Sequence, residues 1–302
     1  MNYNETPLLT IVCVTYNHEK YIDDAIKGFL SQITNFSFVI LVHDDASTDR
    51  TAEIVRNYDR QHPDLFRNIY QTENQHSKNL LHYGIIFNQV NTKYIALCEG
   101  DDYWTDPLKL QKQVDFLESH EDYNGVFHKV SLLNNTTNES SECILNTDTP
   151  DSIEVTDLLK KNIIRTCSIL LRTESVSPLF TNNILKKAMP GDWLSFIFAI
   201  RNKKMKYLSD NMAVYRIHDG GIWSEAKDIE LRYDKELFNG YVFLKQILPY
   251  KYFKLVFHRY AYYLGYFATK NLKEKNYMNY ILFKLKLYCE LLKMNFLKLI
   301  IR

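Results

Sequence analysis

The first hundred residues alternate continuous apolar runs with segments of helical periodicity. Largely continuous apolar runs, which are typical of buried strands, cover 8–14, 36–42 and 94–98, and a short strand is expected near 67–70. Apolar residues at helical spacing mark the segments between them, at 19–32, 48–58 and 79–90. This alternation predicts right-handed βαβ units on a mostly parallel central sheet that is flanked by helices.

The remaining two thirds of the chain give weaker signals. Helices are expected at 107–120 and 192–200, and strands at 167–171 and 213–217. The polar segment 134–141 is expected to be an exposed loop. From residue 228 onward the chain is rich in Tyr, Phe, Leu and Lys, which predicts a helical C-terminal appendage on the α/β domain.

Charge is unevenly distributed, although the formal net charge of the 302 residues is only +1. The stretch from Tyr241 to Arg302 holds twelve Lys or Arg and two Asp or Glu. A basic segment on an acidic body indicates an anionic membrane or another polyanion as its neighbour. No nucleic-acid-binding motif accompanies it, so we expect no nucleic-acid partner.

The five cysteines form no CxxC pair, and Cys13, Cys98 and Cys167 fall in or beside apolar runs. Reduced, buried thiols are therefore expected, as in the cytosol. The N-terminal residues lack the basic and apolar regions of a signal peptide. A cytoplasmic protein, or one bound to the inner face of the plasma membrane, is the resulting expectation.

Polar clusters follow three of the expected strands. Thr15-Tyr16-Asn17 follows the first, Asp44-Asp45 ends the second, and Glu99-Gly100-Asp101-Asp102 follows the strand at 94–98. Ligands of parallel sheets bind beyond the carboxyl ends of the strands, where these clusters converge. Adjacent carboxylates repel unless a cation compensates, which favours Mg²⁺ or Mn²⁺ bridging a diphosphate. The alternative for both acidic pairs is that they only stabilise the start of the following helix, where Ser47 or Thr48 could also act as the cap.

Together these motifs closely resemble the family 2 glycosyltransferases, which have the GT-A fold. The matching stretches are 9–18, the pair Ser31-Gln32, 42–49 and 99–104. The resemblance is strong over 7–120 and weaker to about 225. It implies a GT-A catalytic domain at 1–227, with a donor-binding half at 7–120, an acceptor half at 121–227, and the helical region at 228–302.

The resemblance also assigns roles to residues of the first half. Asp45 is expected to meet the base, and Val14, Thr15 and Tyr16 to form the wall of the base pocket, with Asn17 fixing the loop. Asp101 is expected to contact the ribose or support the metal site. Asp102 is expected to bind the divalent metal directly, whereas the role of Glu99 is left open.

Two later motifs complete the expected site. Met189-Pro190-Gly191-Asp192-Trp193 matches the place of the family's catalytic base, so Asp192 is the expected base, although Asp is also a common helix cap. Tyr215-Arg216-Ile217-His218 resembles a segment that closes over the donor diphosphate. His218 is expected to complete the metal shell or to donate to a phosphate, and Arg216 to neutralise the leaving group. Gly220 and Gly221 would make this segment mobile.

The resemblance therefore predicts a hexosyltransferase-type enzyme. It would move a sugar from a nucleotide-diphosphate donor, a UDP-sugar by expectation, to a hydroxyl acceptor with inversion. The expected setting is surface polysaccharide or glycolipid assembly, with a glycan or lipid-linked acceptor. Residues 240–302 would contact anionic membrane, or alternatively form a helical bundle that packs on the catalytic domain or on a second subunit in a homodimer.

Two other functions stay open on the residues alone. A nucleotidyltransferase also needs paired carboxylates and a metal, but usually carries a Gly-rich, basic triphosphate loop after its first strand. Here Thr15-Tyr16-Asn17-His18-Glu19 occupies that place. A catalytically inactive sugar-nucleotide-binding protein would keep the same fold, although the presence of both Asp102 and Asp192 argues against it.

Overall fold

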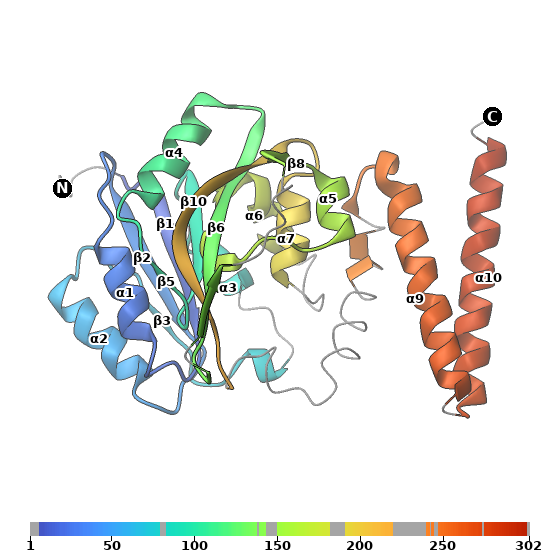
Figure 1. The fold of residues 1–302 in the computed structure, drawn as a ribbon, viewed down its shortest axis with the longest axis horizontal. Coiled ribbons are helices and arrows are strands. Elements are labelled where there is room, and N and C mark those ends of the chain that lie inside the picture. Colours follow the sequence, from blue (N-terminus) through green and yellow to red (C-terminus); the bar gives the residue numbers. More distant parts are fainter. Residues whose placement is uncertain are drawn as a thin grey trace. The chain divides into compact units, whose positions relative to one another are not determined.

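The computed structural model describes residues 6–78, 83–137, 139–142, 150–181, 191–219, 240–241, 243–244, 247–273 and 275–300. The chain divides into two compact units, one of residues 1–187 and 191–226 and one of 188–190 and 227–302. Figure 1 shows a sheet with helices on its flanks in the first unit and two long helices in the second. The expected α/β architecture, a central sheet flanked by helices with a helical C-terminal region, is confirmed.

The first unit contains all the described strands. In chain order they are β1 (Leu9–Thr15), β2 (Phe38–Asp44), β3 (Ile69–Tyr70), β4 (Tyr94–Glu99), β5 (Tyr103–Trp104), β6 (Tyr123–Asn134), β7 (Glu139–Glu142), β8 (Ser152–Ile153), β9 (Leu170–Arg172) and β10 (Lys204–Ile217). The strand order β3-β2-β1-β4-β9-β6-β10-β5 puts β1 in the middle of a parallel half. Beyond β4 the sheet is mixed, since β9 runs antiparallel to both β4 and β6, whereas β6 and β10 are parallel.

The helices of the first unit cover the sheet. They are α1 (Ile22–Leu30), α2 (Thr51–Gln61), α3 (Tyr83–Phe87), α4 (Lys109–Ser119), α5 (Val155–Lys160), α6 (Thr173–Thr181) and α7 (Gly191–Ala199), with short 3-10 turns at His76–Lys78 and Thr166–Ser168. Helices α3, α6 and α7 pack in sequence against one another. One apolar core holds the inner faces of β1, β2 and β4 together with α1 and α4. Burial of these continuous apolar strands is the main stabilising term of the fold.

The register of the parallel half places the strand ends side by side. Thr15 at the end of β1 pairs with Asp44 of β2, and Val14 pairs with Glu99 of β4. Strand β10 reaches the same region because Ala213 and Val214 pair with β5, which follows the 100–102 turn. The three polar clusters that follow these strands therefore meet at one edge of the sheet.

Some local expectations were wrong. Helix α2 begins at Thr51 instead of residue 48, and Asp49 Oδ1 accepts the Thr51 N–H at 2.9 Å, so neither Ser47 nor Thr48 is its cap. The segment expected as a loop at 134–141 forms a hairpin, in which Asn134 of β6 pairs with Glu139 of β7. Polar side chains fit such an edge hairpin, because it is solvated and pairs through its backbone.

The second unit contains the 3-10 turn Tyr250–Tyr252 and two long helices, α9 (Phe253–Lys273) and α10 (Tyr277–Ile300), which pack on each other. Phe267 of α9 stacks on Phe283 of α10, with ring centroids 5.7 Å apart. Lys275, between the helices, has a left-handed φ of 58°. Among the helices of the described residues, none combines the length and hydrophobicity needed to cross a membrane.

Candidate active site

The turn after β1 is held in one shape by the turn after β2. Asn17 has a left-handed φ of 56°, and its N–H donates to Ser47 Oγ at 2.9 Å. The Thr48 N–H donates to Asn17 Oδ1 at 2.8 Å, and the His18 N–H donates to Thr51 Oγ1 at 2.8 Å. Asn tolerates this backbone region better than most residues. Asn17 thus fixes the loop, and the turn aims the following side chain, His18, across the ends of the strands.

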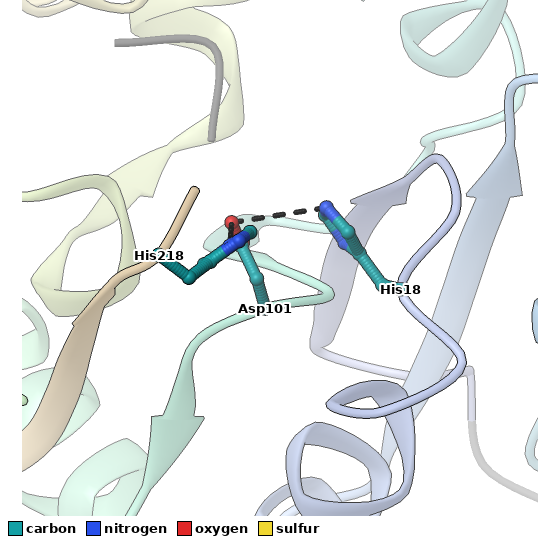
Figure 2. Close-up of side chains that lie close together, drawn as sticks. All are labelled: His18, Asp101 and His218. Atoms are coloured by element: carbon teal, nitrogen blue, oxygen red, sulfur yellow. Dashed lines mark hydrogen bonds and ion pairs between the residues drawn. The ribbon is translucent and has the colours of Figure 1, made fainter. Parts of the chain in front are cut away.

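Three side chains from separate stretches of chain meet at this edge, as Figure 2 shows. His18 follows β1, Asp101 follows β4 and His218 follows β10. Asp101 Oδ2 lies 3.1 Å from His218 Nε2 and 3.7 Å from His18 Nε2. One ligand atom from each of the three lies within 4.8 Å of the others, so the group has the composition and spacing of a metal site.

The charges of this cluster suit a cation. Burial raises the pKa of Asp101, but the His218 hydrogen bond and the two imidazoles outweigh it, and the pKa lies below its usual value. Asp101 is therefore ionised at neutral pH. Burial lowers the pKa of His18, against the pull of Asp101, and so favours the neutral imidazole. An ionised carboxylate and a neutral imidazole are the forms that bind metals.

Gly100 gives the cluster the room it needs. A Cβ at this position would lie 2.5 Å from Thr15 Oγ1 and 3.0 Å from His18 Nδ1. Only a residue without a side chain lets the turn after β4 approach the turn after β1 this closely.

Asp102, which the sequence predicted as the direct metal ligand, is placed differently from Asp101. It is buried, and its Oδ1 accepts the Arg216 N–H at 2.8 Å. Burial and the neighbouring charges of Asp101 and Glu99 raise its pKa well above the ordinary value. Asp102 lies outside the three-residue group and ties β10 to the turn after β4.

Arg216 is also occupied within the protein. Its guanidinium donates to the backbone oxygen of Asp101 at 2.9 Å and forms an ion pair with Asp24 of α1. The guanidinium also lies 4.4 Å from the centre of the Tyr103 ring. Arg216 is buried at these contacts, so it braces the turn that carries Asp101.

The residues expected to surround the nucleotide base lie at the carboxyl ends of β1 and β2, one strand away from the Asp101 turn after β4. Asp45 is buried, and its carboxylate accepts the N–H groups of Gln75 at 2.8 Å and His76 at 3.0 Å. Thr15 is buried as well, whereas Tyr16 exposes 42% of its surface. Because Thr15 is paired with Asp44, these side chains share the end of the β1–β2 pair. Carboxylate oxygens have further lone pairs, so Asp45 keeps capacity for a ligand.

Asp192 lies in the first turn of α7, as expected from the sequence. It lines a small cavity whose other walls are mostly apolar, including Phe87, Leu97 and Phe180. Its charge contributes to raising the pKa of partly buried Glu99 to about 8, after burial itself and the charge of Asp101. Asp192 and the Asp101 turn therefore interact through Glu99. Met189, Pro190, Gly220 and Gly221 lie outside the described residues.

Sequence reasoning did not assign a role to His18, although it is part of the motif after β1. The available signal was its position directly after a residue expected to fix the loop at a strand end. His18 Nδ1 is buried and has no hydrogen-bond partner.

A profile described as Glycosyl transferase family 2 matches residues 10–176. An uncharacterised protein of Mycobacterium tuberculosis is 37% identical over 220 residues, which cover 72% of this chain and 61% of that protein. The chain thus spans about three fifths of that relative's length. TuaG of Bacillus subtilis is 24% identical over 229 residues, covering 74% of this chain and 86% of TuaG.

Solved structures share the fold at low sequence identity. S. aureus TarS in complex with UDP-GlcNAc has a TM-score of 0.63 at 18% identity, covering 85% of this chain and 71% of that one. The mannosyltransferase PcManGT from Pyrobaculum calidifontis has a TM-score of 0.57 at 16% identity, covering 87% and 71%. The family profile spans more than half of the chain, and the GT-A fold agrees with it. The chain belongs to glycosyltransferase family 2.

Proposed function

We propose that the protein transfers a sugar from a nucleoside-diphosphate sugar to a hydroxyl acceptor, with inversion of the anomeric centre. A UDP-sugar is the first candidate for the donor. The observation that carries this proposal is the approach of Asp101 and His218 to 3.1 Å at the carboxyl ends of the strands. TarS was solved with UDP-GlcNAc, and PcManGT with GDP-Man and Mn²⁺, which supports a nucleotide-sugar donor. Val14, Thr15, Tyr16, Asn17 and Asp45 would hold the nucleoside beside this pair.

Asp101 and His218 would hold a divalent metal, Mg²⁺ or Mn²⁺. The ionised carboxylate and the adjacent imidazole fit such an ion. When bound, the ion would supply Lewis-acid chemistry and offset the charge of the departing diphosphate. In place of the direct metal contact expected from the sequence, we assign Asp102 the task of fixing β10 through the Arg216 N–H. Arg216 would support donor binding indirectly, because it holds the turn that carries Asp101.

Asp192 would act as the general base. Its carboxylate takes the proton of the acceptor hydroxyl while that oxygen bonds to the anomeric carbon of the donor. The bond from this carbon to the diphosphate oxygen breaks, and its electron pair leaves with the nucleoside diphosphate. A single displacement of this kind inverts the anomeric centre. The place of Asp192 in the first turn of a buried helix supports a fixed orientation for the carboxylate.

The second unit would bring the enzyme to a lipid-linked or glycan acceptor on an anionic membrane. Exposed apolar side chains recur every three or four residues along α10, at Tyr277, Ile281, Leu285 and Tyr288. Exposed Met278 and Leu282 widen this stripe, and exposed Lys284 and Lys286 lie at its two edges when it is drawn on a helix of 3.6 residues per turn. An apolar stripe flanked by lysines suits the interface of an anionic bilayer. TuaG is named a putative teichuronic acid biosynthesis glycosyltransferase, which supports a role in polysaccharide assembly, and we place this role at the inner face of the plasma membrane.

A panel of UDP- and GDP-sugars, each with Mn²⁺ or Mg²⁺, tests the proposal. The melting temperature should rise with one donor only when metal is present, and that donor should then be consumed with an acceptor present. Asp192→Asn should keep the thermal shift and lose transfer. Binding without turnover in the wild type would indicate an inactive sugar-nucleotide-binding protein. Release of pyrophosphate from a nucleoside triphosphate would indicate a nucleotidyltransferase.

A further inference from the structure

We infer that His18 is a third protein ligand of the metal, so that two imidazoles and one carboxylate form the centre. This centre binds Mn²⁺ or Co²⁺ in preference to Mg²⁺, and it binds the ion in the absence of a nucleotide. The inference rests on the proposed function for the presence of a metal at Asp101 and His218. It adds a ligand, a metal preference and an order of binding to that site.

The distances fit an octahedral shell. Neighbouring ligands in such a shell lie about 3 Å apart, since each is about 2.1 Å from the ion. His218 Nε2 is 3.1 Å from Asp101 Oδ2, and His18 Nε2 is 3.7 Å from the same oxygen. The ligand atoms of all three side chains lie within 4.8 Å of one another.

His18 is also prepared for this role by its surroundings. Its backbone N–H is held by Thr51 Oγ1, so the turn fixes the side chain without using either ring nitrogen. A second pair of contacts locks the same turn, because the Glu19 N–H donates to Asp49 Oδ2 at 3.0 Å and the Arg50 N–H to Glu19 Oε2 at 3.1 Å. Nε2 of His18 faces the Asp101 carboxylate, whereas Nδ1 is buried without a hydrogen-bond partner.

The chemistry of the ligands then sets the metal. Mg²⁺ is usually bound through one or two carboxylates together with substrate phosphates, and it keeps several waters. Imidazole nitrogens favour the later first-row metals, for which affinity rises along the series from Mn²⁺ to Cu²⁺. Three protein ligands also hold an ion before any phosphate arrives. The donor would therefore meet an ion that is already in place, with positions open for its diphosphate oxygens.

Metal titration of the full chain without nucleotide tests this inference. Calorimetry should show one Mn²⁺ or Co²⁺ site and much weaker Mg²⁺ binding. His18→Gln should weaken Mn²⁺ binding by at least about tenfold, since even outer partners of metal ligands are worth about 10- to 100-fold in affinity. His62→Gln, at an exposed position on the end of α2, is the matched control and should bind like the wild type.

Pulsed electron paramagnetic resonance on the Mn²⁺ form counts the coordinated imidazoles directly. Two nitrogen couplings are expected in the wild type and one in His18→Gln. A single coupling in the wild type, or unchanged Mn²⁺ affinity in folded His18→Gln, would overturn the inference. If two imidazoles bind Mn²⁺ but no sugar nucleotide is consumed, the proposed transfer reaction is wrong and the metal site stands.

Discussion

The backbone N–H of Arg216 donates a hydrogen bond to Oδ1 of buried Asp102 at 2.8 Å, across 114 residues of chain. This bond joins the last part of β10 to the turn after β4, and His218 follows two residues later. The two neighbouring acids of the turn thus divide the work. Asp101 faces the imidazoles, while Asp102 holds the strand that delivers one of them.

Asp102→Ala should therefore destabilise the protein as well as the site. The Arg216 N–H would lose its acceptor in a buried place, which costs about 1–3 kcal/mol. Asp102→Asn keeps an oxygen for this N–H and should cost less than the alanine variant. Urea unfolding of both variants, with exposed Asp64→Ala as the control, measures the difference. Equal stability of the alanine variant and the wild type would contradict this role.

Gly100→Ala should disrupt the approach of the two turns. Its Cβ would meet Thr15 Oγ1 at 2.5 Å and Thr15 Cβ at 2.8 Å, so backbone must move, at a cost of about 1–3 kcal/mol. The same movement separates Asp101 from His18 and should weaken Mn²⁺ binding. Gly84→Ala in α3 is the matched control, because a Cβ there meets nothing within 4 Å. Its stability should be unchanged or slightly higher, since alanine favours a helix.

Lys109 predicts a pH dependence of stability. Burial lowers the pKa of this ammonium to about 7, while its Nζ donates to Gln113 Oε1 at 2.8 Å and lies 3.9 Å from the centre of the Trp104 ring. The unfolded chain, with a lysine pKa of about 10.4, binds a proton that the folded chain does not between about pH 7 and 10. The free energy of unfolding should therefore gain up to about 1.4 kcal/mol per pH unit from Lys109 as the pH rises through this window.

Lys109→Met removes this contribution. Chemical unfolding at about pH 7.5, 8.0 and 8.5, all within this window, gives the difference in the free energy of unfolding between the wild type and the variant. The difference should shift in favour of the wild type as the pH rises, and subtracting the two curves cancels the shared effect of the buried cysteines. Parallel curves would mean that the Trp104 ring keeps the ammonium charged.

The apolar stripe of α10 predicts membrane binding. Replacing Ile281 and Leu285 together by Glu should abolish flotation of the full chain with vesicles that contain anionic lipid, because charge in the stripe opposes burial among acyl chains. Asn279→Glu, exposed on the same helix but outside the stripe, is the control and should float like the wild type. Self-association of the wild type that the double variant loses, with no flotation, would favour the homodimer instead.

The parallel half of the fold could be predicted from sequence because its strands are continuous apolar runs. The same signal is missing from β6, where Tyr123–Asn134 mixes polar and apolar residues, and from much of β10, so the mixed half of the sheet was not foreseen. The edge with Thr15, Asp45 and Asp101 followed from the rule on strand ends. Which of Asp101 and Asp102 faces the site depends on side-chain directions within one tight turn, and residue types carry no information on that. Arg216 was expected at the donor because its ion pair with Asp24, 192 residues away in the chain, leaves no mark in the sequence.

The central claim is that Asp101 and the imidazoles beside it hold a metal that sugar transfer requires. The most direct test measures consumption of the donor that the thermal panel identifies, with and without Mn²⁺, for the wild type and Asp101→Asn, a variant of equal size that removes only the charge. The account predicts Mn²⁺-dependent turnover in the wild type and none in the folded variant. Turnover that needs no divalent metal, or that survives unchanged in Asp101→Asn, would contradict it.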